Sequence, residues 1–179
     1  MAIEIEKKFR LTNEQFVEVE PLITELNAEY FGEQFEENIL YTNQIIFKKG
    51  GVVRVRKTDN KCVLTYKGLL KNTSDKKIHI EHETNVEKPE EIEKILEYLM
   101  LEKTLVYEKY RKTWRLNEVE VVLDKLPFGY YMEIEGKLKA IKETEKLLNA
   151  EKFEVEQKTY PFLTKLLGRK NGNIIEARF

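Results

Sequence analysis

The sequence contains little cysteine, proline or glycine, and neither sign of charge dominates. Its one cysteine, Cys62, excludes an intramolecular disulfide and favours a reducing compartment. No apolar run approaches membrane-spanning length, and the first residues lack the basic-then-apolar pattern of a signal peptide. Lys and Arg number 31 against 32 Asp and Glu, so no basic field attracts nucleic acid or an anionic membrane. We therefore expect a soluble, cytoplasmic protein.

Charged residues make up 35% of the chain and apolar residues 41%, which is enough to build a core. No repeat or Pro/Gly-rich linker divides the 179 residues. We expect a single domain over residues 1–179, with residues 170–179 as a mobile tail.

Short runs that alternate between apolar and polar residues predict strands over 3–10, 38–43, 52–57, 61–67, 77–86, 105–116, 118–124 and 130–135. Helical spacing predicts helices over 13–28, from Pro89, over 138–149 and from Pro161. Thr12 or Asn13 is the expected N-cap of the first helix, and Pro21 should kink or split it. Because strands outnumber helices and most links are short, the pattern favours an antiparallel α+β fold.

The predicted strands have one apolar and one charged face, since residues two apart share a face. Like charges pair on these faces: Glu4 with Glu6, Arg54 with Arg56, Glu81 with Glu83, and Glu133 with Glu135. Periodicity alone favours a sheet with a solvated polar face. The clustering of like charges, repeated on strand after strand, favours instead a sheet that curls shut around a charged lumen. The residues leave both interpretations open.

A lumen with separate acidic and basic clusters suits a metal ion and a polyanion. Mg²⁺ usually binds one or two carboxylates together with substrate phosphates. Arg and Lys neutralise the remaining phosphate oxygens, and Arg binds them through a two-pronged fork.

A series of motifs runs in a fixed order along the chain. The segments are Glu4-Ile5-Glu6-Lys7-Lys8, Val53-Arg54-Val55-Arg56, Leu64-Thr65-Tyr66-Lys67-Gly68, Glu81 with Glu83, Glu108-Lys109-Tyr110-Arg111, Val122-Leu123-Asp124, Pro127-Phe128-Gly129 and Glu133-Ile134-Glu135. This order resembles the CYTH proteins, or triphosphate tunnel metalloenzymes, which include class IV adenylyl cyclases, thiamine triphosphatases and inorganic tripolyphosphatases. Residues 37–41 and 159–161 look closest to the bacterial and archaeal cyclase-like branch.

The resemblance implies a closed antiparallel β-barrel of eight strands, a triphosphate tunnel, with helices packed outside. It implies an acidic set that holds or orients Mg²⁺ or Mn²⁺: Glu4, Glu6, Glu81, Glu83, Asp124, Glu133 and Glu135. It implies a basic set that binds the triphosphate: Arg54, Arg56, Lys67, Lys109 and Arg111. Lys8 would contact the phosphates or position the attacking group. His79 stands where the family usually has Arg, so its phosphate contact would depend on pH.

The leading functional hypothesis is a class IV adenylyl cyclase that converts ATP to cyclic AMP and pyrophosphate. The first alternative is a triphosphatase acting on tripolyphosphate, a nucleoside triphosphate or thiamine triphosphate. The second alternative is a non-catalytic sensor of polyphosphate or nucleotide. The expected partner is a small triphosphate, ATP or tripolyphosphate, with no nucleic acid and no membrane, and a homodimer stays open. The residues alone do not distinguish cyclisation from hydrolysis.

Overall fold

The computed structural model describes residues 5–72 and 77–179; for 69–72 and 77–80 only the backbone is described. The strands are β1 (Glu6–Leu11), β2 (Glu29–Thr42), β3 (Val52–Lys57), β4 (Cys62–Asn72), β5 (Lys77–Asn85), β6 (Glu102–Leu116), β7 (Val119–Leu126), β8 (Gly129–Gly136), β9 (Glu154–Val155), β10 (Arg169–Asn171) and β11 (Ile174–Ala177). The helices are α1 (Asn13–Glu25), α2 (Gln44–Lys48), α3 (Pro89–Tyr98), α4 (Leu138–Leu147) and α5 (Tyr160–Leu167), with a 3₁₀ turn at Ala150–Lys152.

Contacts divide the chain into two compact units, and each is described by itself below. Unit 1 contains Glu36–Glu108 and Tyr160–Arg178. Unit 2 contains residues 5–35, Lys109–Thr159 and Phe179. The long strands β2 and β6 each contribute residues to both units.

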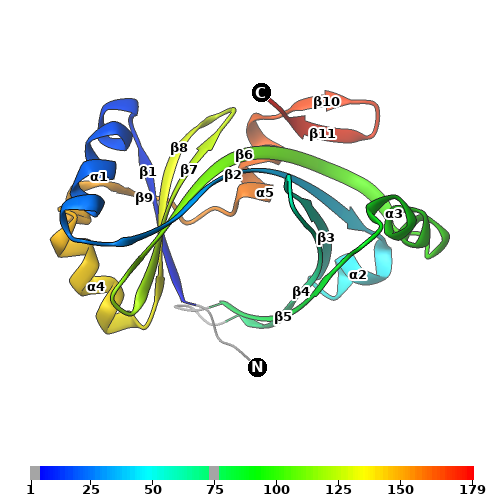
Figure 1. The fold of residues 1–179 in the computed structure, drawn as a ribbon. Helices are drawn as coiled ribbons and strands as arrows, with labels where there is room; N and C mark the ends of the chain where they lie inside the picture. The colour runs from blue at the N-terminus through cyan, green and yellow to red at the C-terminus, as the bar shows by residue number, and fades with distance from the viewer. Residues whose placement is uncertain (1–4, 73–76) are drawn as a thin grey trace. The chain divides into compact units, whose positions relative to one another are not determined.

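In unit 2, β1, β7 and β8 form an antiparallel sheet with one apolar face. Phe9, Met132 and Ile134 are fully buried on that face, where α1 and α4 cover it (Figure 1). Thr12 caps α1 through a capping box with Gln15, as its position predicts. Because side chains alternate across a strand, the residues between these apolar ones lie on the opposite, polar face.

In unit 1, β3, β4 and β5 pair antiparallel, and the apolar face of the sheet packs against α3 (Figure 1). The core there includes Tyr41, Val55 and Leu96. Glu93 of α3 accepts a 2.9 Å hydrogen bond from the Tyr41 hydroxyl and forms an ion pair with Lys57. These polar contacts fix α3 against the sheet, so the opposite face of β3 and β4 is left for other side chains.

The C-terminal residues of unit 1 form a hairpin, where a mobile tail was expected. β10 pairs with β11, and β11 pairs in parallel with β6. Arg178 then forms ion pairs with Glu37 at 2.8 Å and Glu108 at 2.6 Å. The turn at Gly172, with φ of 60°, allows the chain to reverse here.

The antiparallel α+β prediction is confirmed, but the closed barrel of eight strands is not. The described residues form eleven strands joined in the order β5-β4-β3-β2-β6-β7-β8-β1-β9, with β10 and β11 attached beside β6. Within the described part, no hydrogen-bonded pairing joins β5 to β9 and closes this path. The extra strands are short ones, β9, β10 and β11, which carry too few residues to show an alternating pattern.

The helix predictions at Pro89, 138–149 and Pro161 are confirmed by α3, α4 and α5. α1 runs on through Pro21 as one helix, so the chain is not split there; the expected kink stays a prediction. β2 begins at Glu29 rather than at the predicted Asn38. The prediction missed the first half of the strand because that half lacks a regular alternation of apolar residues. No helix in the described ranges is long and apolar enough to cross a membrane.

Candidate functional site

The polar face of unit 2 carries a group of five charged side chains, here called the buried cluster: Lys8, Lys109, Arg111, Asp124 and Glu133. They come from β1, β6, β7 and β8, and strand register brings them together. Lys8 lies opposite Glu133 in the β1–β8 pair, and Arg111 lies opposite Asp124 in the β6–β7 pair. Directly opposed residues in an antiparallel sheet have Cβ atoms about 5 Å apart, which is close enough for ion pairs.

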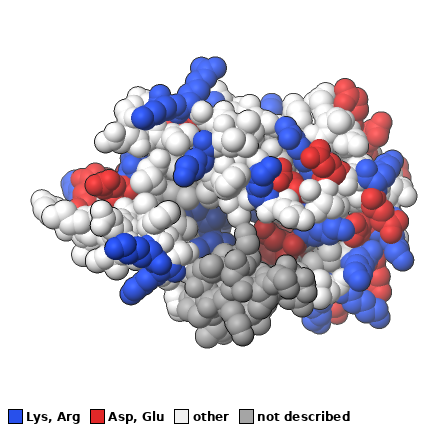
Figure 2. Space-filling model, turned by 180° about the vertical axis from the view of Figure 1, so that it is seen from behind, with Lys and Arg blue, Asp and Glu red and all other residues white. Residues whose placement is uncertain are grey.

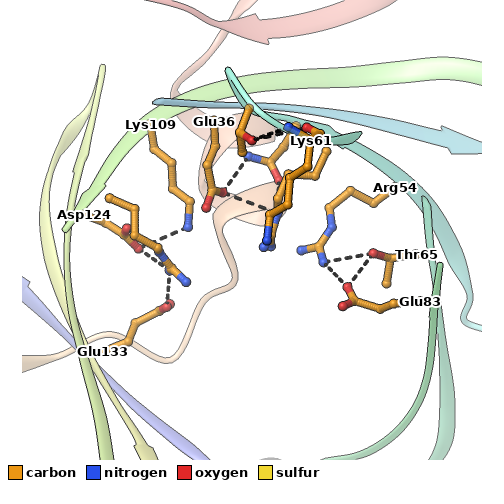
Figure 3. Close-up of polar contacts among 12 residues, drawn as sticks. Glu36, Arg54, Lys61, Thr65, Glu83, Lys109, Asp124 and Glu133 are labelled. Carbon is orange, nitrogen blue, oxygen red and sulfur yellow. Dashed lines mark hydrogen bonds and ion pairs between the residues drawn. The ribbon is translucent and has the colours of Figure 1, made fainter. Parts of the chain in front are cut away.

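Arg111 is the centre of the buried cluster. Its Nε donates to Asp124 Oδ1 at 2.7 Å, and its Nη2 donates to Glu133 Oε2 at 2.6 Å. Lys109 approaches Asp124 at 3.4 Å, and Lys8 approaches Glu133 Oε1 at 3.1 Å. Figure 3 shows Lys109 directed toward Asp124, and it shows the carboxylate of Glu133 directed into the same group of side chains. These contacts link three cations to two carboxylates.

Burial strengthens the electrostatic interactions among these charges. Lys109 is 2% exposed and Asp124 is fully buried, so their ion pair is little screened by water. Burial alone raises the pKa of the Glu133 carboxyl, and Asp124 adds to that effect. Arg111, Lys8 and Lys109 together outweigh both and lower the pKa. Glu133 is therefore ionised at neutral pH.

A pair of carboxylates lies beside the buried cluster on the same polar face. Glu6 of β1 stands directly opposite Glu135 of β8 in the strand register. Like charges placed directly opposite repel, so a cation near them would lower the energy of the pair. Glu4, the first predicted metal ligand, lies outside the described residues. Among the residues that are described, no three His, Cys, Asp or Glu side chains group closely enough to hold a metal.

The polar face of unit 1 carries a second group, here called the open cluster: Arg54, Thr65, Lys67, Glu81 and Glu83. Arg54 Nη2 donates to Thr65 Oγ1 and to Glu83 Oε1, each at 3.2 Å. Thr65 Oγ1 donates to Glu83 Oε1 at 2.7 Å, and Figure 3 shows Arg54 directed toward both residues. Lys67 pairs with Glu81 at 2.7 Å. Two cations are balanced by two carboxylates.

The open cluster is wetter than the buried one, since the side chains of Glu83 and Lys67 are 47% and 38% exposed. Burial raises the pKa of the Glu83 carboxyl, but the Thr65 hydrogen bond and the Arg54 charge outweigh it and lower that pKa. Arg54 Nε, unlike the Nη2 atom of the same side chain, is buried and has no hydrogen-bond partner among the described residues. A buried donor without a partner lowers the stability of the folded protein.

Arg56 shares the polar face of β3 with Arg54 but has other partners. Its Nε donates to Asn38 Oδ1 at 3.2 Å and lies 3.4 Å from Glu36 Oε2. Glu36, Asn38 and Thr65 were not among the predicted site residues. Thr65 shares a strand face with the predicted cation Lys67, a signal that could have identified it, whereas Asn38 meets Arg56 only through the pairing of β2 with β3. Glu36 lay outside the predicted strand.

The predicted site residues therefore fall into two groups, one in each unit. The buried cluster contains Lys8, Lys109, Arg111, Asp124 and Glu133, with Glu6 and Glu135 beside it; the open cluster contains Arg54, Lys67, Glu81 and Glu83, with Arg56 beside it. His79 pairs through its backbone with Leu69, but its side chain is outside the described part, so its predicted role stays a prediction. Figure 2 shows cations and anions interspersed over the described surface of one face.

Family comparison places the chain in a known group. The family model described as CYTH domain matches residues 2–161, so the chain belongs to the CYTH family. The predicted resemblance is thereby confirmed. No curated protein matches the sequence.

Solved structures with the same fold include proteins from an archaeon, a bacterium and a plant. The Pyrococcus horikoshii protein PH1012 is 27% identical, with a TM-score of 0.76 over 90% of this chain and 99% of its own. A proposed adenylate cyclase from Vibrio parahaemolyticus is 19% identical, with a TM-score of 0.70 over 91% and 98%. HpAC1 from Hippeastrum, described as a proposed adenylyl cyclase with a dominant triphosphatase activity, is 17% identical, with a TM-score of 0.67 over 97% and 99%. At these last two identities the likeness concerns the fold alone.

Proposed function

We propose that this protein is a divalent-metal-dependent enzyme that acts on the triphosphate group of a small molecule. Membership of the CYTH family supports a triphosphate substrate. Each unit by itself supplies a polar sheet face with Arg and Lys side chains placed by strand register. Phosphoryl transfer depends on positioning and charge neutralisation more than on covalent help from the protein, and these are the residue types it needs.

The observation that carries the proposal is the set of unfilled donors on β3. Arg54 Nε is buried without a partner among the described residues. The terminal amino groups of Arg56 also lack a hydrogen bond or ion pair within the described part of the chain. Two guanidinium groups on one strand face thus retain donors for an anion with several oxygens. A triphosphate has enough oxygens to fill them, and charge-assisted hydrogen bonds to phosphate are strong.

The carboxylates of unit 2 fit a hard divalent cation. Glu6 and Glu135 face each other across β1 and β8, and Mg²⁺ needs only one or two protein carboxylates when phosphates complete its shell. Both oxygens of Glu133 contact cations, as do those of Asp124. From the family resemblance and the facing positions of Glu6 and Glu135 we assign metal binding to Glu4, Glu6 and Glu135, with Asp124 and Glu133 orienting the cations. Bound Mg²⁺ or Mn²⁺ would neutralise phosphate charge and orient the attacking oxygen.

Hydrolysis is the reaction that these clusters support best. The side chains that define the buried and open clusters are Lys, Arg, Asp, Glu and Thr, which recognise phosphate or balance charge rather than seat a purine. We propose a triphosphatase acting on tripolyphosphate or a nucleoside triphosphate. Adenylyl cyclisation, favoured by the resemblance of residues 37–41 and 159–161, is the second candidate. Cyclisation requires in addition a nucleoside-binding site that brings the ribose 3′-hydroxyl to the α-phosphate.

A product-resolved assay tests the proposal. Purified protein is incubated separately with tripolyphosphate, ATP and thiamine triphosphate, each with Mg²⁺, with Mn²⁺ and with chelator. Metal-dependent release of orthophosphate supports the triphosphatase, whereas cyclic AMP with pyrophosphate supports the cyclase. If none of the three substrates is turned over with either metal, the result would contradict an enzymatic function and favour a sensor.

Variants of one carboxylate give the matched control. Glu135→Gln keeps the size of the side chain and removes the charge that is proposed to hold the metal. We expect its metal-dependent turnover to fall at least about 100-fold, the loss of several kcal/mol of charge stabilisation in the transition state. Glu118→Gln is the control, because Glu118 is an exposed residue whose side chain is 67% accessible. Equal activity in both variants would remove Glu135 from the metal assignment.

A further inference from the structure

Two arginines on the same face of β3 are held in different ways. Arg54 is bound at a terminal nitrogen, Nη2, by Thr65 and Glu83. Arg56 is bound at Nε, which donates to Asn38 Oδ1 at 3.2 Å and lies 3.4 Å from Glu36 Oε2. A guanidinium has one N–H at Nε and four more at its two terminal nitrogens. Arg56 therefore keeps four donors at its tip, and the described residues provide no partner for them.

The two residues that hold Arg56 are themselves rigidly placed. Glu36 and Asn38 are both fully buried, and they lie two apart on β2. Asn38 is the register partner of Arg56 across the β2–β3 pair. Asn38 Nδ2 also donates to Glu36 Oε2 at 3.4 Å, so the amide and the carboxylate hold each other. A buried carboxylate and a buried amide thus converge on one N–H of a side chain that is 25% exposed.

We propose that Glu36 and Asn38 are positioning residues that orient Arg56 so that its two terminal amino groups bind a phosphate group end-on. The inference rests on the proposed triphosphate function and adds two residues to it. Glu36 and Asn38 do not touch the substrate; they act through Arg56. By fixing Nε they remove rotamer freedom that the long arginine side chain would otherwise lose on binding.

The charge of Glu36 has a second consequence for selectivity. A carboxylate at Nε keeps an incoming anion away from the side edge of the guanidinium, formed by Nε and one terminal nitrogen. The end formed by the two terminal nitrogens stays available for a two-pronged contact. Lysine could not be oriented in this way, because its ammonium is a point charge without a fixed fork. Position 56 therefore requires arginine specifically.

A double-mutant cycle on tripolyphosphate binding tests the inference. Dissociation constants are measured by calorimetry for wild type, Glu36→Gln, Arg56→Lys and the double variant. Glu36→Gln should weaken binding about tenfold when Arg56 is present, because a charged partner of its Nε is lost. In the Arg56→Lys background the same change should alter binding less than about twofold, because the Nε–H that Glu36 holds is gone.

Each outcome has one meaning. Equal losses in both backgrounds would show that Glu36 supports the sheet generally, and would overturn the inference while leaving the proposed function intact. Absence of tripolyphosphate binding to the wild type would overturn the proposed function, and the inference with it. Unfolding midpoints are measured for all four proteins. If Glu36→Gln does not fold, Asn38→Ala enters the same cycle with the same expected coupling to Arg56.

Discussion

The buried cluster of unit 2 and the open cluster of unit 1 contain similar residues but differ in their access to water. Lys109 and Asp124 are almost completely buried, whereas the side chains of Glu83 and Lys67 are 47% and 38% exposed. Removing one member of a buried ion pair leaves an uncompensated charge, which is strongly destabilising. An exposed pair contributes little because water replaces the lost partner. The same chemistry thus supports the fold in unit 2 and leaves unit 1 free to exchange its partners for an anion.

The arginines of the two clusters also differ in how fully their donors are paired. In unit 2 Arg111 contacts both Asp124 and Glu133. In unit 1 Arg54 is paired through Nη2 while its buried Nε has no partner among the described residues. An anion can therefore bind at Arg54 without first breaking every existing contact. We infer that variants in unit 1 change anion binding at little cost to stability, and that variants in unit 2 change both.

The largest expected effect is on stability. Asp124→Ala removes the carboxylate that pairs with Lys109 and Arg111, so we expect a loss of about 3–5 kcal/mol in the free energy of unfolding. Glu83→Ala removes an exposed carboxylate from Arg54 and should cost about 1 kcal/mol or less. Urea unfolding at pH 7 measures both. Similar losses would show that burial does not separate the two clusters.

The next effect is on binding. Arg54→Ala should weaken tripolyphosphate binding about 10- to 100-fold, since charge-assisted hydrogen bonds contribute roughly 1.5–3 kcal/mol. Its free energy of unfolding should change by about 1 kcal/mol, because Glu83 stays partly solvated. Calorimetry and urea unfolding separate these quantities. An Arg115→Ala variant serves as the matched control, because Arg115 is exposed on β6 and belongs to neither cluster. Unchanged affinity in Arg54→Ala would remove it from the phosphate set.

A smaller effect is expected in acid. The pKa of Glu133 in the folded protein is lowered, so its carboxylate adds stability above its unfolded pKa of about 4.3, and that stability is lost as pH falls through the folded pKa. The free energy of unfolding should therefore drop below about pH 4, and Glu133→Gln should flatten that drop. Glu83→Gln should flatten it less, because Glu83 is more exposed. Parallel pH profiles for wild type and Glu133→Gln would contradict this assignment.

The smallest effect on stability is expected at Lys67. Its ion pair with Glu81 is partly exposed, so Lys67→Met should change the free energy of unfolding by less than about 1 kcal/mol. Affinity for tripolyphosphate should still fall several-fold, and more steeply at low salt, because a solvated cation acts mainly through long-range charge. Titrations at two ionic strengths test this. A loss of affinity that is independent of salt would indicate a different role.

Much of the fold and site could be predicted because the signals were local. The period-2 pattern around Lys8 and Glu133 predicted both strands and the face on which these side chains lie. The ordered motifs then predicted the family, which the match over residues 2–161 confirms. Helix α3 followed from Pro89 and its apolar spacing.

The remaining features depend on which strands lie side by side. The pairing of Arg111 with both Asp124 and Glu133 depends on the register of three strands, and motif order alone does not reveal it. Asp124 and Glu133 were predicted to belong to the set that holds or orients the metal, and this stays a prediction; their contacts with Arg111 lead us to propose the orienting role. Glu36 was missed because the first half of β2 has no regular alternation.

The most direct test of the account is a calorimetric titration of wild-type protein with tripolyphosphate in the presence and absence of Mg²⁺, with orthophosphate as the matched anion. We expect tripolyphosphate to bind at least about 100-fold more tightly than orthophosphate, because it fills several guanidinium and ammonium donors at once. We also expect Mg²⁺ to strengthen this binding, because a divalent cation on the phosphate oxygens neutralises part of their charge. Equal affinity for the two anions, or no binding of tripolyphosphate, would contradict the account.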